Sequence, residues 1–203
     1  MMFDLRQCFG DIDIYLFDQL LRGHITPGVR ILDAGCGPGR NLVYLLREGY
    51  DVYGVDRDEK AIHFLRERAA ALAPTLPTAN FQVATLENLP YDDAFFDVVL
   101  CSAVLHFAAN DGQFRAMLDG VWRKLRPDGF LFCRLASSIG LEKEFRQIEG
   151  RRFLLPDGSE RYLVDADLLE RLTTELGGRL LDPIKTTIVQ NQRCMTTWVV
   201  RKT

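Results

Sequence analysis

The chain has 203 residues, of which 47% are hydrophobic, and its 25 Lys and Arg against 28 Asp and Glu give a net charge of −3. This length is typical of one α/β domain, and the acidic balance excludes a general electrostatic attraction for nucleic acid. No segment has the length and hydrophobicity of a membrane span or a signal peptide, so we expect one cytoplasmic domain over 1–203.

The first half of the chain alternates helical and strand patterns. Apolar residues at helical spacing from Ile12 to Leu20 predict an N-terminal helix, and Asp58 is typical of a helix N-cap. In chain order the patterns predict a helix over 11–22, a strand at 30–34, a helix over 40–48, a strand at 51–56, a helix over 58–73 and a strand at 79–84. This order is typical of a parallel sheet with crossover helices.

The second half continues this alternation and ends differently. The patterns predict a strand at 96–102, a helix with an apolar series from Phe114 to Leu125, a turn at 126–129, a strand at 130–135, a helix from Asp165 to about 176, and strands near 180–189 and 195–201. The unbroken apolar run at 96–102 is typical of a fully buried parallel strand. The last two strands are joined by a polar turn, which predicts an antiparallel hairpin.

One segment, 137–164, interrupts the alternation. The run from Phe153 to Leu163, centred on Pro156-Asp157-Gly158, predicts a β-hairpin. Ligands bind at the carboxyl ends of strands in open α/β sheets, so an insertion after the strand at 130–135 is expected to form a small cap over a ligand pocket. The candidate walls of that pocket are Ser137, Ser138, Arg152, Phe153 and Tyr162.

The most informative segment is Asp33-Ala34-Gly35-Cys36-Gly37-Pro38-Gly39, between a strand pattern and a helix start. Alternate glycines leave almost no Cβ bulk in the turn, so its backbone can adopt positive φ and approach a ligand closely. Asp56 ends the next strand, and an acid at that place can accept hydrogen bonds from both hydroxyls of a ribose. Together these features predict a cofactor that contains adenosine.

The glycine spacing also separates two classes of adenosine cofactor. A dinucleotide fingerprint, G-x-G-x-x-G, counted from Gly35 would need glycine at position 40, where the chain has Arg40. Asp33 would repel a pyrophosphate, but it suits a cofactor that carries an ammonium group. A nicotinamide dehydrogenase is therefore disfavoured.

This segment resembles the first motif of class I S-adenosylmethionine-dependent methyltransferases, and the resemblance extends from 31 to 135. Residues 35–41 and 48–52 resemble the tellurite-resistance methyltransferase group in particular. The resemblance implies a Rossmann-like fold: a doubly wound, mostly parallel α/β sheet of seven strands with a C-terminal antiparallel hairpin. It also implies S-adenosyl-L-methionine as cofactor and methyl transfer to a small-molecule or oxyanion acceptor.

The resemblance assigns roles to particular residues. Gly35, Gly37 and Gly39 would make room for the methionine part and the ribose, Asp56 would hold the ribose hydroxyls, and Asp33 would orient the loop and the cofactor ammonium. The other candidates for cofactor contact are Cys36, Asn41, Arg57 over the adenine face, Thr85 and the Leu86 N–H at the adenine ring, and the Cys101 carbonyl beside the ammonium. Many members place an acid after the third strand for the adenine amino group, where this chain has Thr85.

Two side chains are candidates for contact with the acceptor. His106 is the candidate base, because histidine titrates near neutral pH, and the alternative is a histidine that packs and hydrogen-bonds structurally. Arg134 is the candidate for holding an anionic acceptor, and the alternative is an arginine that points into solvent. A base is needed only where the acceptor carries a proton, since orienting an activated sulfonium and its acceptor supplies much of the acceleration.

Other functions remain open from the sequence. A protein or RNA methyltransferase is disfavoured by the acidic chain and by the lack of an added recognition domain, while a non-catalytic S-adenosylmethionine-binding protein would show the same motifs. The five cysteines share no metal-like spacing and the three histidines are dispersed, so no metal site is expected. The sequence indicates neither the acceptor's identity nor the oligomeric state.

Overall fold

A computed structural model describes residues 4–203. The α-helices are α1 (Leu5–Phe9), α2 (Ile14–Leu21), α3 (Val43–Arg47), α4 (Glu59–Leu72), α5 (Asp111–Lys124) and α6 (Ala166–Glu175). Short 3-10 helices are η1 (Thr78–Asn80), η2 (Leu86–Asn88) and η3 (Leu105–Phe107). The strands are β1 (Arg30–Ala34), β2 (Asp51–Asp56), β3 (Phe81–Val83), β4 (Phe96–Ser102), β5 (Leu125–Ala136), β6 (Arg146–Glu149), β7 (Arg152–Leu154), β8 (Glu160–Tyr162), β9 (Gly178–Leu180), β10 (Lys185–Val189) and β11 (Arg193–Lys202).

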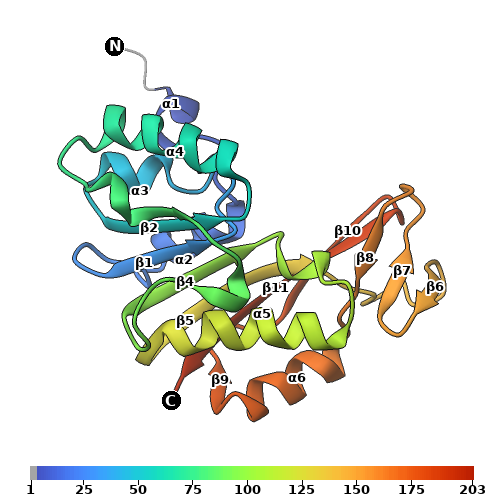
Figure 1. Cartoon of the computed structure of the whole chain (residues 1–203). Coiled ribbons are helices and arrows are strands. Elements are labelled where there is room, and N and C mark those ends of the chain that lie inside the picture. Colours follow the sequence, from blue (N-terminus) through green and yellow to red (C-terminus); the bar gives the residue numbers. More distant parts are fainter. Residues whose placement is uncertain (1–3) are drawn as a thin grey trace.

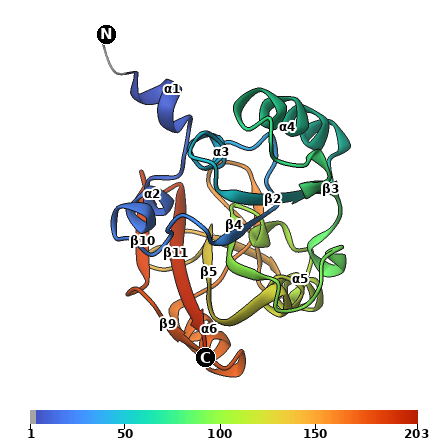
Figure 2. The ribbon, with the colours of Figure 1, turned by 90° about the vertical axis from the view of Figure 1, so that its left-hand side faces the viewer.

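One large sheet organises the chain, with strand order β3-β2-β1-β4-β5-β11-β10 (Figures 1 and 2). The five strands from β3 to β5 are parallel, and β11 runs antiparallel to β5, β9 and β10. Both β9 and β10 pair with β11, at different parts of its length, so these two short strands share the seventh position of the sheet. The expected doubly wound sheet with a C-terminal antiparallel hairpin is confirmed.

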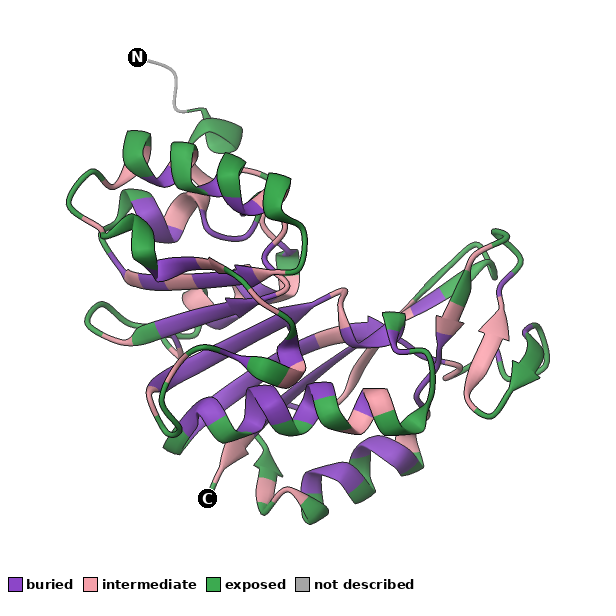
Figure 3. Cartoon of the chain, viewed as in Figure 1, coloured by how far each residue is buried: buried purple, intermediate pink, exposed green. Residues whose placement is uncertain are grey.

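Helices cover both faces of this sheet (Figure 1). Side chains alternate along each strand: in β4, Val98 and Leu100 pack with α2, α3 and α4, whereas Val99 and Cys101 pack with α5 and α6. All seven residues of β4 are buried, as expected for a central parallel strand (Figure 3). Strand β4 is therefore packed on both faces along its whole length.

Several elements differ from the sequence prediction. Helix α3 is shorter than the expected 40–48, because the chain stays in a turn after Gly39, whose φ is +78°. Strand β5 is longer than 130–135, and it takes in the expected turn through an irregular stretch in which Asp128 has a φ of +62°. Helix α1 was not expected, since its five residues are too few to show a helical period.

The segment 137–164 forms a separate three-stranded antiparallel sheet, β6-β7-β8, beyond the carboxyl end of β5 (Figure 1). The predicted hairpin is present as β7 and β8, and β6 is an additional strand. A small apolar cluster joins this sheet to the main one, with Phe145, Leu155 and Leu163 packed against Ala136 and Cys194. Among residues 4–203, no helix is long and apolar enough to cross a membrane.

Candidate active site

The glycine loop between β1 and α3 has the strained backbone that its sequence predicts. Gly35, Gly37 and Gly39 have φ values of +81°, +51° and +78°, which favour glycine. A Cβ on Gly35 would lie 2.3 Å from Val104 Cγ2, whereas a Cβ on Gly37 would meet nothing within 4 Å. Gly35 is thus required by packing, and Gly37 presents bare backbone to open space.

Asp56, at the end of β2, holds this loop in place. Its Oδ2 accepts a hydrogen bond of 2.8 Å from the Gly37 N–H, and its Oδ1 accepts one of 2.9 Å from the Asp58 N–H. Each carboxylate oxygen has a second lone pair, so these bonds leave acceptor capacity for ribose hydroxyls. Asp56, the residue expected to bind the ribose, therefore also links β2 to the glycine loop.

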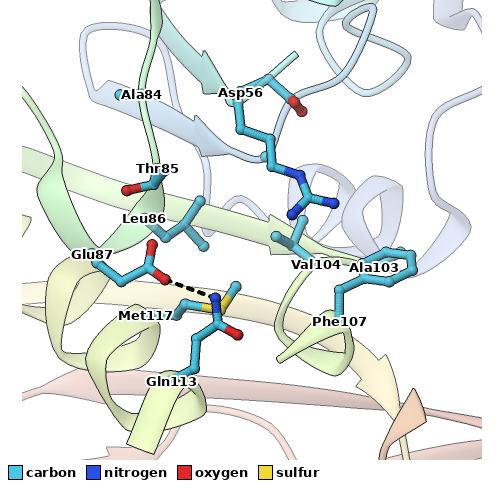
Figure 4. Close-up of a pocket in the computed structure, with 12 residues that line it drawn as sticks. Asp56, Ala84, Thr85, Leu86, Glu87, Ala103, Val104, Phe107, Gln113 and Met117 are labelled. Atoms are coloured by element: carbon cyan, nitrogen blue, oxygen red, sulfur yellow. Dashed lines mark hydrogen bonds between the residues drawn. The ribbon is translucent and has the colours of Figure 1, made fainter. Parts of the chain in front are cut away.

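A cavity of about 270 Å³ opens beside the loop at the carboxyl ends of β1, β2 and β4 (Figure 4). It is lined by Gly35, Asp56, Arg57, Ala84, Thr85, Leu86, Glu87, Ala103, Val104, Phe107, Gln113 and Met117. Five residues predicted to contact the cofactor are thus brought together here. We refer to this space as the first cavity.

Sequence reasoning missed two polar residues of the first cavity, Glu87 and Gln113. Gln113 Nε2 donates a hydrogen bond of 3.1 Å to Glu87 Oε1 (Figure 4). Burial opposes ionisation of Glu87, but hydrogen bonds from its own backbone, Gln113 and Thr85 hold its pKa below the usual value, so it is a carboxylate. Glu87 could have been predicted from the sequence, because it follows Thr85 by two residues after the end of the third strand. No sequence pattern pointed to Gln113 on α5.

Three other predicted contacts lie away from the first cavity. The Cys36 side chain is buried against β2, and its backbone N–H donates to the Val55 carbonyl at 2.9 Å. Asn41 is also buried, and its Oδ1 accepts a hydrogen bond of 3.0 Å from the Asp13 N–H. The Cys101 side chain is enclosed in β4 beside β5. The Cys36 and Cys101 side chains therefore serve packing and the Asn41 side chain accepts a hydrogen bond within the fold, while the cofactor contacts of these three residues stay predictions.

Asp33 is 1% exposed and does not line the first cavity. Its Oδ2 has no hydrogen-bond partner within residues 4–203. Burial raises the pKa of Asp33 to about 7, with Arg40 opposing the rise and Asp56 adding to it. A buried carboxyl with an unused oxygen is suited to a cationic donor such as an ammonium group.

A second cavity, of about 290 Å³, shares Ala103 with the first. It is lined by Ala103, His106, Arg134, Ala136, Leu155, Asp157, Ser159, Arg161, Val189, Arg193 and Met195. The cap hairpin, β5 and the β10–β11 turn each contribute. Ala103 has a φ of +64°, uncommon for a residue with a Cβ, and its N–H donates to the Arg134 carbonyl at 2.7 Å.

The cap contributes to the second cavity with other residues than those predicted. None of the five expected wall residues lines it. Tyr162 is buried instead, with its ring stacked on Phe114 at a centroid distance of 4.5 Å. The cap residues that do line the second cavity are Arg161 and three residues of the hairpin turn, Leu155, Asp157 and Ser159.

His106 lines the second cavity, but its geometry corresponds to the structural alternative. Its Nδ1 accepts a hydrogen bond of 3.1 Å from the Ala136 N–H, so the proton of the neutral ring is on Nε2. Burial, with the nearby Arg161 charge, lowers the pKa of His106 to about 4. One nitrogen is occupied and the other is protonated at neutral pH, so the predicted role of base is not supported.

Arg134 also lines the second cavity, and it does not point freely into solvent. Its Nη1 donates to Asp13 Oδ2 at 2.5 Å, and its guanidinium lies 5.2 Å from the centroid of the Tyr15 ring. Arg40 Nη2 lies 3.8 Å from the same Asp13 oxygen. Asp13, which sequence reasoning missed, is wholly buried as the N-cap of α2 and compensates much of the Arg134 charge.

Comparison with known proteins identifies the family. A family model described as a methyltransferase domain matches residues 32–133, half of the chain. An uncharacterised methyltransferase from Synechocystis sp. is 35% identical over 105 residues, covering 52% of this chain and 46% of that protein. A phthiotriol/phenolphthiotriol dimycocerosates methyltransferase from Mycobacterium tuberculosis is 34% identical over 133 residues, covering 59% of this chain and 46% of that protein.

The chain thus spans about half the length of the curated relatives it matches. Among solved structures, its fold is similar to that of a SAM-dependent methyltransferase from Methanosarcina mazei. The TM-score is 0.73 at 21% identity, and the match covers 90% of this chain and 96% of that one. Sequence and fold agree, and the chain belongs to the methyltransferase domain family of class I S-adenosylmethionine-dependent methyltransferases.

Proposed function

We propose that this protein transfers a methyl group from S-adenosylmethionine in the first cavity to a small molecule in the second. The observation that carries the proposal is the shared residue Ala103, at the carboxyl end of β4, where the two cavities meet. Transfer from a sulfonium needs donor and acceptor in line and close together. Two adjoining cavities that share a lining residue support that arrangement.

The residues around the first cavity match the parts of the proposed cofactor. Asp56, in the lining, would bind the ribose. Outside the lining, Gly37 of the glycine loop would leave room for the ribose, and the buried Asp33 would pair with the ammonium. Glu87, rather than Thr85, would accept a hydrogen bond from the adenine amino group, since it is the carboxylate at that end of the cavity. Glu87 would thus take the role of the acid that many members of the family place directly after the third strand, where this chain has Thr85.

For the acceptor we propose a small oxyanionic molecule. A cavity of about 290 Å³ suits a small molecule. The loop's resemblance to the tellurite-resistance group points the same way. The segment 137–164 would act as a cap over the acceptor in one cytoplasmic domain, with no nucleic-acid or membrane partner.

Calorimetric titration tests the cofactor assignment. S-adenosylmethionine and S-adenosylhomocysteine are expected to bind, and NAD is not. Heat with NAD and none with the two sulfur compounds would overturn the assignment. If both bind but no label leaves methyl-labelled S-adenosylmethionine for any acceptor, the protein is a binding module instead.

A further inference from the structure

The second cavity is cationic in a protein of net negative charge. Arg134, Arg161 and Arg193 line it, and Asp157 is the one carboxylate among its lining residues. The whole chain carries a net charge of −3, so this excess of positive charge is local. Guanidinium groups gathered around a small space are suited to bidentate binding of a planar oxyanion.

Two of these arginines form no ion pair in the described part of the chain, although their charges act on Asp157 of the same cavity. Arg134 is paired with Asp13, but within residues 4–203 no carboxylate forms an ion pair with Arg161 or Arg193. Arg161 is held in place by a hydrogen bond of 2.7 Å to the Glu160 carbonyl and by the Phe107 ring, whose centroid lies 4.8 Å away. Phe107 in turn lines the first cavity. Arg161 therefore stands beside the junction of the two cavities.

The second cavity has no strong base at neutral pH among its lining residues. His106 has both nitrogens engaged or protonated, as described above. Asp157 accepts hydrogen bonds from the side chain and the backbone of Ser159, which with the Arg161 and Arg193 charges hold its pKa below the usual value. The remaining lining residues are arginines, a hydroxyl or apolar groups. This lining therefore favours an acceptor atom that arrives already deprotonated.

We propose that the acceptor is a small carboxylate, held by Arg161 and Arg193 and methylated on its own carboxylate oxygen. This proposal rests on the proposed function and names its substrate class. A phenol would keep its proton at neutral pH, and an amine would be a cation that the arginines repel. A carboxylate is both anionic and nucleophilic without a base.

The step balances in atoms and charge. One carboxylate oxygen attacks the methyl carbon with a lone pair, the carbon–sulfur bond breaks, and its electron pair goes to sulfur. The sulfonium cation and the carboxylate anion become a neutral thioether and a neutral methyl ester, and no proton is released. Because the ester has lost the charge that the arginines bind, the same two side chains that hold the substrate favour release of the product.

The test uses the full chain and S-adenosylmethionine labelled in its methyl group. Acetate, succinate and benzoate are the carboxylate probes, selenite and tellurite the inorganic oxyanions, and phenol, methylamine and mercaptoethanol the remaining classes. A methyl ester releases volatile methanol in mild base, whereas methyl ethers, amines and thioethers do not. Binding of the carboxylate probes, which carry C–H protons, to the protein loaded with S-adenosylhomocysteine is measured in parallel by saturation-transfer NMR.

We expect base-labile label on at least one carboxylate. Arg161→Gln and Arg193→Gln should each raise its KM about 10- to 100-fold, with unchanged affinity for S-adenosylhomocysteine. Arg193→Lys should raise the KM less than Arg193→Gln does, because lysine keeps the positive charge. Arg123→Gln is the matched control, since Arg123 is exposed on α5 and lines neither cavity.

Three results would overturn the proposal: base-stable label on another class, label on selenite or tellurite alone, or no binding of any carboxylate to the loaded protein. Equal kinetics of the Arg161 and Arg193 variants and the Arg123 control would also overturn it. Failure of S-adenosylmethionine to bind would instead refute the proposed function, so the two failures are distinguishable.

Discussion

Replacing Asp33 by Asn should stabilise the protein without cofactor while weakening its binding of S-adenosylmethionine. Asn keeps the shape of the side chain and removes the buried charge. Raising the pKa of Asp33 from 3.8 to about 7 corresponds to roughly 4 kcal/mol of cost for the ionised form in the folded state. The carboxylate thus destabilises the fold in which it would serve a ligand, as many functional groups do.

The sign of the pH dependence follows from proton uptake. Because the folded pKa of Asp33 lies above the unfolded one, the folded state keeps a proton that the unfolded state releases between about pH 4 and pH 7. The stability that Asp33 contributes is therefore complete below about pH 4 and is lost as the pH rises to about 7. Relative to Asp33→Asn, the wild-type free energy of unfolding should fall by about 1.4 kcal/mol per pH unit across this window and level off above it.

Urea unfolding of both proteins without cofactor, at several values across pH 5 to 8, measures this difference. Any constant effect of the amide, such as an unpaired N–H, cancels in the slope. Calorimetry in buffers of different ionisation enthalpy should also show that S-adenosylmethionine displaces a proton near pH 6.5 from the wild type and none from the variant. Parallel unfolding profiles, or equal proton release by both proteins, would refute the reasoning.

The remaining predictions concern the loop and the cavity junction. Asp56→Ala should weaken S-adenosylmethionine binding by roughly 1.5–3 kcal/mol in calorimetry, whereas a variant that binds like the wild type would exclude Asp56 from the site. Gly35→Ala should lower the free energy of unfolding by about 1–3 kcal/mol in urea, because its Cβ would overlap Val104, and an unchanged value would contradict this packing. Gly37→Ala should lower the free energy of unfolding less than Gly35→Ala does, but it should bind cofactor less well than the wild type. A decrease in the free energy of unfolding as large as that of Gly35→Ala would contradict the open surroundings of Gly37. Ala103→Leu should keep cofactor binding and reduce turnover about 100-fold, since it fills the junction, and full turnover would place methyl transfer elsewhere.

Local sequence patterns were enough to predict most of the fold. Strands β1, β2 and β4 lie where the sequence predicts them, because each is a short apolar run between turn residues. Helix α4 begins after its predicted N-cap, Asp58. Helix α3 was overestimated because the turn after Gly39 is set by its packing on Leu65 of α4, a contact that no local pattern reports.

The candidate site was predictable only where it is contiguous in sequence. Asp56 ends one strand and Arg57 follows it, while Thr85 and Leu86 follow another strand, so strand ends alone placed these residues at one cavity. The second cavity joins β5, the cap turn and the β10–β11 turn, which approach one another only through tertiary packing. Arg193 therefore gave no signal, and the Arg134–Asp13 pair spans 121 positions of the chain.

The two cavities divide the chain into successive halves. Every residue that lines the first cavity falls between 35 and 117, inside the segment 32–133 that the family model matches. Most residues of the second cavity fall beyond that segment, between 134 and 195. On the proposed function, mutation or exchange of the C-terminal part would alter which molecule is accepted while the proposed donor site stays intact. Proteins that share the first half could then differ in substrate while keeping the same cofactor-binding residues. The same boundary, near residue 133, would suit the exchange of C-terminal parts between such proteins.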